Sequence, residues 1–485
     1  MSLLDPEDWA AFGASAHRML DDAIEYMRTV RDRPAWQPVP QAAKDALAES
    51  IPRDGQPLDA VYAAFKEHIL PYPTGNIHPR FWGMVKGTGT PVSMLADMLA
   101  AAMNSNVSGF DQSATYVELE TIGWLTELFG LPPEASGLFV SGGTPANVLG
   151  LLVARNARAP FDARKEGLFD HPRLRVYAST QTHAWLKRAC NIIGIGESAL
   201  CEIPADSRHR ILIPELRSSI SRDRSGGLVP FCVVGNAGTV NAGATDDLRA
   251  LAEICRSENL WFHVDGAFGA LTVLTRKYKN VADGMQFADS IAFDLHKWGY
   301  LSYDIGCVLV RDGAEHRAAM ANPAPYASNA FNVSGFASTY PLLFADLGVQ
   351  LSRSFRALKV WMAFKTYGTS RLGEAIERNI DQAQYLASIV RQSDDFELLA
   401  PAELNVVCFR HKTPGDDDRA CNLHNAELLA KLQQSGVALP TSTILDGRFA
   451  IRVAITNHRT SAEDIDILLA ALRRCAAGLE EQVRQ

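Results

Sequence analysis

Cysteine is scarce in this chain, and its spacing matches no metal-binding or redox motif. There are eight cysteines among 485 residues, and none forms a C-x-x-C pair. They are widely separated and mostly lie within apolar runs, which indicates reduced core residues. We therefore expect a cytoplasmic protein, and we predict no metal site.

Long apolar runs and clusters of basic charge are also absent. Crossing a bilayer takes about 18 or more uncharged apolar residues, and the most apolar helix pattern, SMLADMLAAAM, is too short and contains Asp97. The N-terminus, MSLLDPEDWAAFG, is acidic where a signal peptide would be basic. The formal net charge is −8, with scattered Lys and Arg, so phosphate backbones and anionic lipids find no attractive surface. Nucleic-acid and membrane partners are not expected.

The remaining composition is that of a folded enzyme with more than one core. Hydrophobic residues make up 47% of the chain and charged residues 21%, a globular balance, and the length exceeds what one core supports. Residues 1–85 show only helical patterns. Residues 86–355 alternate short β-branched or aromatic runs with helical stretches, which predicts a mostly parallel sheet covered on both faces. Residues 356–485 predict a small α+β domain.

Two segments suggest interactions beyond these cores. The amphipathic helices of residues 1–85 would rarely be stable alone, so we expect them to pack on another surface, such as a partner subunit. Residues 318–345, AAMANPAPYASNAFNVSGFASTYPLLFA, have no clear periodicity. Such a segment within a compact enzyme predicts a mobile lid or binding loop.

The first candidate site motif is LFVSGGTPANVLGLL, a strand followed by glycines and a helix. Ligands of open α/β sheets bind beyond the carboxyl ends of the strands. Gly142 and Gly143 let the backbone approach an anion, and Thr144, the predicted N-cap, adds a hydroxyl donor to the helix amides. The motif predicts a phosphate site. A tight turn without a ligand is the alternative.

The second motif is LWFHVDGAFGA, in which Asp265 ends an apolar strand. A carboxylate buried there needs a cationic partner, and a protonated pyridine nitrogen is one. Ala267 is small enough to leave room for the face of a ring. The alternative is that Asp265 caps a nearby helix.

The third and fourth motifs supply a lysine and a histidine. In DSIAFDLHKWGY, His296 and Lys297 follow a strand among apolar and aromatic neighbours. Most lysines are solvated surface groups, but these neighbours should desolvate Lys297 and favour the neutral amine that forms a Schiff base with an aldehyde. In ASTQTHAWLKRACNIIGIG, His183 begins a helix. It either stacks on a ring opposite Ala267 or caps that helix.

Together these motifs resemble one enzyme family. The order SGGTPAN, H-x-x-x-K-R-A, HVDGAFG and DLHKW is similar to that of the group II decarboxylases dependent on pyridoxal 5′-phosphate (PLP), which include aromatic-L-amino-acid and glutamate decarboxylases. The resemblance runs from HPRFWGMV near residue 78 to RVAITNHRTSAEDID near residue 467. It therefore covers most of the chain.

The resemblance implies a fold and a role for each motif. The fold would be fold-type I, aspartate aminotransferase-like, in a homodimer with active sites at the interface and N-terminal helices that clasp the partner. Lys297 would form the Schiff base, Asp265 would pair with the pyridine nitrogen, and His183 would stack on the ring. The residues that would surround the cofactor with them are Gly143, Thr144, Thr239, Ala267, Asp294 and His296.

The implied reaction is decarboxylation of an L-amino acid, with an aromatic one as first choice, to an amine and CO₂. The chain departs from the family at the loop tyrosine tied to protonation, where an ungapped count back from RSFRALKVW gives Phe344. Tyr340 or His183 would then take that role. Otherwise oxygen reacts and an aldehyde forms in place of the amine. Another PLP reaction, and a non-catalytic protein with this fold, remain as alternatives.

Several residues near the expected substrate have two interpretations. Lys86, in GMVKGTGTP, either recognises a side-chain carboxylate or is an exposed lysine. Phe81, Trp82 and Phe110 either line an aromatic pocket or belong to the core. Arg452 either supports the site from the C-terminal domain or pairs with a local carboxylate.

Overall fold

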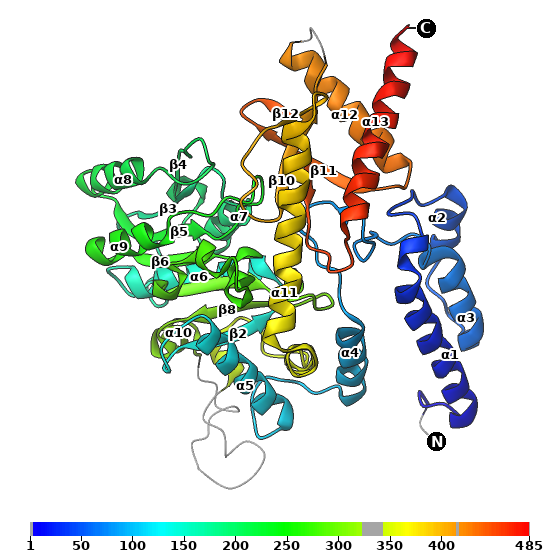
Figure 1. Ribbon diagram of the computed structural model, residues 1–485. Helices are drawn as coiled ribbons and strands as arrows, with labels where there is room; N and C mark the ends of the chain where they lie inside the picture. Colours follow the sequence, from blue (N-terminus) through cyan, green and yellow to red (C-terminus); the bar gives the residue numbers. More distant parts are fainter. Residues whose placement is uncertain (1–2, 323–342, 414–416, 485) are drawn as a thin grey trace. The chain divides into compact units, whose positions relative to one another are not determined.

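The computed structural model describes residues 3–322, 343–413 and 417–484 (Figure 1). The chain divides into two compact units. The larger comprises Val85–Phe409 and Ala454–His458, and the smaller comprises Met1–Met84, Arg410–Val453 and Arg459–Gln485. Within the described residues, no helix is both long and apolar enough to cross a membrane.

A seven-stranded sheet forms the centre of the larger unit, in the order β2-β8-β7-β6-β5-β3-β4. Its strands are β2 (Ser136–Val140), β3 (Leu174–Ser179), β4 (Leu200–Ile203), β5 (Val229–Asn236), β6 (Trp261–Asp265), β7 (Ser290–Asp294) and β8 (Gly306–Val310). The pairs from β4 through β3, β5 and β6 to β7 are parallel, whereas β8 is antiparallel to both β7 and β2. The predicted α/β class with a mostly parallel sheet is confirmed.

Helices cover both faces of this sheet. They include α6 (Gly143–Arg158), α7 (Trp185–Ile192), α8 (Ile213–Ser225) and α9 (Leu248–Glu258). Right-handed crossovers between parallel strands place α6 and α7 on one face and α8 and α9 on the other, given the strand order. Strands β6, β7 and β8 are buried along their whole length, which explains their continuous apolar sequences.

The other helices of the larger unit begin and end at identifiable residues. They are α4 (Pro91–Met103), α5 (Ser113–Leu128), α10 (Gly313–Met320) and α11 (Ala357–Gln392), with the short strand β9 (Phe396–Leu398) and most of β10 (Val406–His411) after them. Thr90 and Ser93 form a capping box at the start of α4. Helix α11 is interrupted at Gly368, where φ is 70°, a conformation that suits glycine.

The start of α6 differs from the prediction. The sequence placed Thr144 at the N-cap, but the helix begins at Gly143 and its N-cap is Gly142, with no side-chain hydrogen bond. Gly142 has an extended backbone, φ 164° and ψ −178°, so the chain turns from strand to helix two residues earlier than a cap at Thr144 would require. The backbone amides at this helix start are therefore not covered by a capping side chain.

The smaller unit combines the two ends of the chain. Its elements are α1 (Trp9–Arg28), α2 (Gln41–Leu47), α3 (Leu58–Ala64), the π-helix η2 (Phe65–Ile69), β1 (Phe81–Trp82), α12 (Asp418–Gln434), β11 (Leu439–Leu445), β12 (Arg448–Ala454, whose last residue lies in the larger unit) and α13 (Ala462–Arg484). The fully buried Asp464 binds Arg31 at 2.7 Å and Arg80 at 3.3 Å. The predicted domain boundaries at 85/86 and 355/356 stay predictions, and α11 belongs to the unit of the central sheet.

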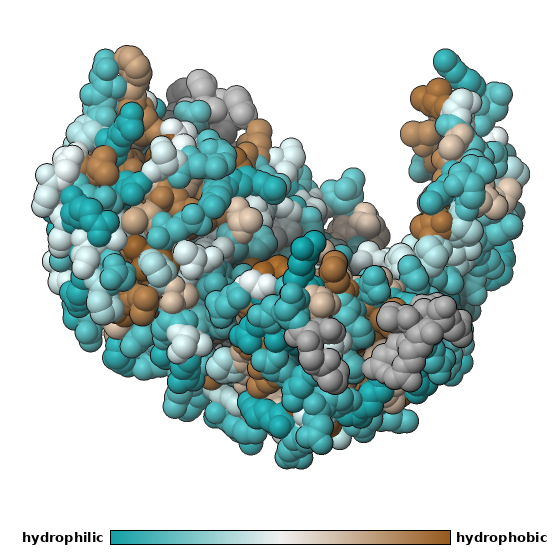
Figure 2. All heavy atoms as spheres, turned by 90° about the horizontal axis from the view of Figure 1, so that it is seen from above, coloured by the Kyte–Doolittle hydropathy of each residue, from teal (hydrophilic) through white to brown (hydrophobic). Residues whose placement is uncertain are grey.

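The surface is mostly hydrophilic in the view of Figure 2, with hydrophobic residues in small groups. The N-terminal helices carry several exposed large apolar side chains: Trp9, Phe12, Ile24, Leu58, Val61, Phe65 and Ile69. Such residues in one part of a chain are typical of a surface that contacts another molecule.

A fully buried ion pair stabilises the larger unit. The side chains of Glu118 on α5 and Arg353 are both 0% exposed and form a salt bridge. Arg353 also donates to the carbonyls of Val107 at 2.9 Å and Phe139 at 2.8 Å. The guanidinium therefore joins α5, the end of β2 and the segment before α11.

Glu118→Gln should lower the free energy of unfolding by about 3 kcal/mol, because removing one partner leaves a buried charge unpaired. Urea denaturation followed by circular dichroism measures this change. Glu127→Gln, at an exposed position of the same helix, is the control and should change it by less than about 0.5 kcal/mol. Equal effects of the two substitutions would contradict a stabilising role of the pair.

Candidate active site

Three of the predicted motifs lie at the carboxyl ends of the neighbouring parallel strands β5, β6 and β7. Asp265 is the last residue of β6 and Asp294 the last residue of β7. These strands are neighbours, with Asp265 opposite Ala292. Lys297 follows β7, and the loop that contains Thr239 follows β5, the other neighbour of β6. The sheet thus brings together residues far apart in sequence, as the strand-end argument predicted.

Lys297 forms an ion pair with Asp294. Its Nζ lies 2.8 Å from Asp294 Oδ2, and the two side chains are 19% and 3% exposed. The neighbours Leu295 and Trp298 are fully buried, so the apolar surroundings predicted for Lys297 are present. The carboxylate of Asp294 is a counter-charge for the Lys297 amine. This ion pair was not predicted from the apolar neighbours of Lys297.

Glycines allow the backbone to approach these side chains closely. A Cβ atom at Gly143 would lie 2.7 Å from Asp294 Oδ2, and one at Gly87 would overlap the carbonyl oxygen of His296. The segment around Gly87 therefore passes directly over the residue that precedes Lys297. Any larger residue at position 87 would displace it.

Asp265 is 7% exposed and accepts hydrogen bonds from neutral donors. Its Oδ1 accepts from Ala267 N at 3.1 Å and Asn147 Nδ2 at 3.4 Å, and its Oδ2 accepts from Trp185 Nε1 at 2.6 Å. Among the described residues it has no salt-bridge partner. A carboxylate oxygen accepts two hydrogen bonds, so Oδ2 can accept one more.

The sequence analysis missed two of these donors, Asn147 and Trp185. Asn147 lies on α6 and Trp185 is the first residue of α7. Both residues are inside quoted motifs, but nothing in their spacing shows that they converge on Asp265. Three donors directed at one carboxylate stabilise its negative charge. Asp265 ends β6, and the next helical turn begins at Gly269 with Phe268 at its N-cap, so Asp265 is not the cap of that turn.

His183 lies just before α7, and its Nδ1 accepts a hydrogen bond from Trp185 N at 3.1 Å. The ring thus provides the cap-like contact that was the alternative prediction. Although His183 as a residue is exposed, partial desolvation of its ring lowers its pKa, which favours the neutral imidazole at neutral pH. Because Nδ1 accepts, the neutral ring carries its proton on Nε2. Capping the helix and contacting a ligand are therefore compatible.

His296 and Thr239 are also buried. His296 Nδ1 accepts from Ile305 N at 3.3 Å, and its ring centroid lies 4.3 Å from that of Tyr303. Burial lowers the pKa of His296 and raises that of Tyr303 to about 12. Thr239 Oγ1 accepts from Ala244 N at 3.1 Å. Tyr303 was not among the site residues predicted from the sequence. Its hydroxyl accepts a hydrogen bond from Gly87 N at 3.3 Å.

Of the two candidate residues near the predicted loop, Tyr340 and Phe344, the structure describes only Phe344. Tyr340 lies outside the described residues. Phe344 is fully buried, its N donates to Ser108 O at 2.9 Å, and its ring lies 5.0 Å from the Arg353 guanidinium carbon. These contacts involve the buried ion pair rather than Lys297, Asp265 or His183.

The remaining candidates fall on both compact units. Lys86 is half-buried, and its carbonyl accepts from Thr456 Oγ1. Phe110 is half-buried with φ 71°. Phe81, Trp82 and Arg452 are buried in the smaller unit, with Trp82 Nε1 donating to Thr460 Oγ1 at 3.2 Å. The core interpretation thus fits Phe81 and Trp82 within their unit.

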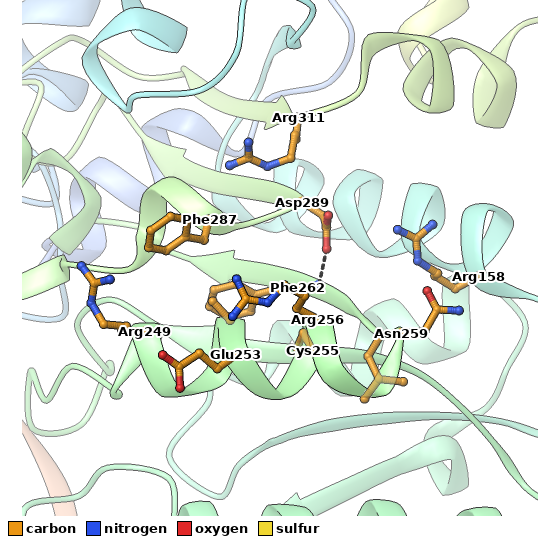
Figure 3. Close-up of a pocket in the computed structure, with 12 residues that line it drawn as sticks. Arg158, Arg249, Glu253, Cys255, Arg256, Asn259, Phe262, Phe287, Asp289 and Arg311 are labelled. Atoms are coloured by element: carbon orange, nitrogen blue, oxygen red, sulfur yellow. Dashed lines mark hydrogen bonds between the residues drawn. The ribbon is translucent and has the colours of Figure 1, made fainter.

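A cavity of about 550 Å³ lies at the opposite, amino ends of the strands (Figure 3). It is lined by α9 and by residues such as Phe262 and Asp289, and several arginines surround it. Arg249 pairs with Asp283 at 2.8 Å and Arg158 with Glu315 at 3.1 Å. Because these cations are already paired and the cavity is far along the strands from Lys297, it is not the site described here.

The strand-end lysine, the buried carboxylate and the glycine-lined helix start define a PLP-dependent enzyme of the α/β class, and comparison with known proteins agrees. The family model described as "Pyridoxal-dependent decarboxylase conserved domain" matches residues 40–412. The chain therefore belongs to the pyridoxal-dependent decarboxylase family, and its cofactor is PLP.

Individual relatives match nearly the whole chain. The aromatic-L-amino-acid decarboxylase of Bacillus atrophaeus is 33% identical over 95% of this chain and 94% of its own. The phenylacetaldehyde synthase of Arabidopsis thaliana is 30% identical over 93% of both. The crystal structure of Oryza sativa TDC with PLP and tryptamine has a TM-score of 0.89 at 25% identity, covering 98% of this chain and 99% of that one.

The residues present fit this cofactor. Asp265 has a remaining acceptor site on Oδ2 and no cation paired with it among the described residues, which suits a protonated pyridine nitrogen. Gly142 and Gly143 leave the start of α6 open, which suits a phosphate. Lys297 supplies a primary amine beside both. These residues would hold the ring nitrogen, the phosphate and the aldehyde respectively.

Proposed function

We propose that this enzyme decarboxylates an aromatic L-amino acid to the corresponding amine, with Lys297, Asp265 and His183 as its central residues. The observation that carries the proposal is the buried Asp265, whose described partners are all neutral donors, one strand away from the Lys297–Asp294 pair. The aromatic substrate is supported by relatives named for aromatic amino acids, such as the Bacillus atrophaeus decarboxylase and the rice tryptophan decarboxylase 2.

Each residue has a role that follows from its contacts. Bound PLP supplies the aldehyde that attaches the amino acid and the ring that withdraws the electrons left when CO₂ departs. Asp265 holds the proton on the ring nitrogen through its charge. Lys297 provides the amine that anchors the cofactor, and Asp294 orients Nζ at 2.8 Å. His183, neutral with its proton on Nε2, presents a flat imidazole and a donor.

A second function, aldehyde formation, is supported by two observations. Phe344, which an ungapped count places at the position of the loop tyrosine, has no hydroxyl, and the relatives include phenylacetaldehyde synthases of Arabidopsis thaliana and Petunia hybrida. In that reaction the amino acid, O₂ and water give the aldehyde, CO₂, ammonia and hydrogen peroxide. Oxygen is reduced to peroxide and the α-carbon is oxidised. The two functions share every residue discussed above and differ in product.

A product assay separates the two. The purified protein loaded with PLP is incubated under oxygen with L-phenylalanine, L-tyrosine, L-tryptophan or L-glutamate, and CO₂, amine, aldehyde and peroxide are quantified. We expect CO₂ and amine in equal amounts from an aromatic substrate, with little peroxide. Equal aldehyde and peroxide would establish the second function. Activity on L-glutamate alone would contradict the aromatic proposal and favour carboxylate recognition by Lys86.

We also propose that the enzyme is a cytoplasmic homodimer. All eight cysteines are free and buried or half-buried, which suits a reducing compartment. The exposed apolar residues of the N-terminal helices suit a surface that a partner subunit covers. Light scattering of the purified protein should give twice the chain mass, and the mass of a single chain would contradict the dimer.

A further inference from the structure

A buried chain of hydrogen bonds leads from the interior of the sheet to Asp265. It consists of Trp261, Ser290, His263 and Asn147, each at most 1% exposed. Trp261 Nε1 lies 2.8 Å from Ser290 Oγ, which lies 2.7 Å from His263 Nδ1. His263 Nε2 lies 2.8 Å from Asn147 Oδ1, and Asn147 Nδ2 lies 3.4 Å from Asp265 Oδ1. Among the described hydrogen bonds, those of Trp261, Ser290 and His263 do not involve Asp265, Lys297 or His183.

The groups at the two ends of this chain allow every hydrogen bond to run in one direction. At one end, the indole N–H of Trp261 can only donate, so Ser290 Oγ accepts from it and keeps its own proton, which is available to donate to His263 Nδ1. At the other end, Asn147 Nδ2 lies 2.9 Å from Gly143 O and near Asp265 Oδ1. Both of these oxygens only accept, so the amide N–H₂ faces them and Oδ1 faces His263. The two ends agree that His263 is neutral with its proton on Nε2.

His263 therefore reinforces the orientation in which the Asn147 amide N–H₂ points at Asp265. If the amide rotated by half a turn, its oxygen would face the Asp265 carboxylate, and its N–H₂ would face the N–H of His263. Both contacts would be repulsive, so the orientation is held from both sides. Burial lowers the pKa of His263 to about 3, and the ring thus stays neutral at neutral pH.

His263 also contacts the second donor to Asp265. The ring of Trp185, whose Nε1 binds Asp265 Oδ2 at 2.6 Å, packs edge-on against His263 with centroids 5.9 Å apart and an interplanar angle of 75°. The position is closely fitted, because a Cβ atom at Gly150 on α6 would lie 2.6 Å from His263 Cε1. One imidazole thus positions both side-chain donors that hold the carboxylate.

We propose that His263 is a positioning residue for the cofactor: through Asn147 and Trp185 it holds Asp265 in the orientation that keeps the pyridine nitrogen of PLP protonated. This inference rests on the role proposed above for Asp265. A histidine that only filled the core would need no continuous, one-directional chain ending at that carboxylate. The proposal predicts that removing the imidazole changes the state of the bound cofactor and not only the stability of the fold.

The test uses His263→Leu and two readouts other than activity. One is the dissociation constant for PLP measured by absorbance, and the other is the ¹⁵N chemical shift of ring-labelled PLP bound to the protein at neutral pH. We expect about a tenfold weaker PLP affinity, because a hydrogen bond to a charged group is weakened. We also expect the ¹⁵N signal to move toward the unprotonated position. His263→Gln keeps an N–H donor near Asn147, so it should retain most of the PLP affinity and most of the native ¹⁵N shift.

His316→Leu is the matched control. His316 is also fully buried, with Nδ1 2.8 Å from Ser136 Oγ and Nε2 2.8 Å from Leu347 O, but its hydrogen bonds do not lead to Asp265. The His316→Leu substitution should lower the unfolding temperature about as much as His263→Leu does. It should leave the PLP affinity and the ¹⁵N shift unchanged. Equal changes in both variants, or a normal shift in His263→Leu, would overturn the proposal.

A second variant keeps the test decisive if His263→Leu does not fold. Asn147→Ala removes the donor to Asp265 directly and should shift the ¹⁵N signal in the same direction. Where both fold, the double variant should show no larger effect than the stronger single one, because the two residues act in one chain. If Asp265→Asn leaves the ¹⁵N signal unchanged, the proposed role of Asp265 itself fails. If only the His263 variants leave it unchanged, this inference alone fails.

Discussion

Replacing Lys297 by alanine should abolish decarboxylation and the visible absorption band of the bound cofactor together. The amine of Lys297 lies 2.8 Å from Asp294 Oδ2, at the end of the strand next to Asp265. No other group of the described site is a primary amine in that position. Loss of a nucleophile that acts as part of a unit typically lowers the rate by about 10⁴-fold or more. Absorbance spectra and CO₂ release on the same preparations measure both effects.

Lys297→Arg and Lys279→Ala are the controls for this prediction. Arginine retains a cation beside Asp294 and should preserve the fold, yet it does not form a Schiff base, so band and activity should still be lost. Lys279 is exposed, and its replacement should change neither. A visible band that survives in Lys297→Arg would show that another lysine holds the cofactor.

Asp265→Asn should give the second largest effect. The substitution keeps the shape of the side chain but removes the charge that would pair with the ring nitrogen. Breaking one side of a buried ion pair costs about 3 kcal/mol or more, which corresponds to a decrease of roughly 100-fold in kcat when the lost interaction stabilises the transition state. Steady-state CO₂ release from an aromatic L-amino acid measures it.

The matched control for Asp265 is Asp283→Asn, which breaks the exposed pair with Arg249. An exposed pair contributes about 1 kcal/mol at most, and this one is distant from Lys297 in the fold, so kcat should be unchanged. A kcat of Asp265→Asn within a few-fold of the native enzyme would mean that the ring nitrogen does not depend on this carboxylate.

Much of the site could be predicted from the sequence, because parallel strands bring their carboxyl ends to one edge. Asp265 was expected at the end of one strand and Lys297 just after another; Asp265 is the last residue of β6, and Lys297 follows β7, which ends at Asp294. The antiparallel direction of β8 was not predicted. Residues 295–305, which join it to β7, contain no long crossover helix, and a parallel connection needs one.

The hydrogen-bond partners of Asp265 could not be predicted in the same way. Asn147 and Trp185 come from α6 and α7, and which face of each helix meets the sheet depends on packing rather than on motif spacing. His263 lies in the same strand as Asp265, two residues earlier, so its side chain is on the same face. That periodicity was present in the quoted motif and could have indicated its connection to Asp265.

Phe344 illustrates a different limit. An ungapped count placed it at the position of the loop tyrosine, and the structure places it against Ser108 and Arg353 in the core. Counting along a sequence gives a position but not its burial. The product assay, and not the identity of this residue, decides between amine and aldehyde.

The most direct test of the central claim is to find the lysine that carries the cofactor. The purified protein loaded with PLP is reduced with borohydride, digested, and analysed by peptide mass spectrometry. We predict a single phosphopyridoxyl group on Lys297, within the peptide that contains DLHKW. Stoichiometric label on another lysine, with Lys297 unmodified, would contradict the account.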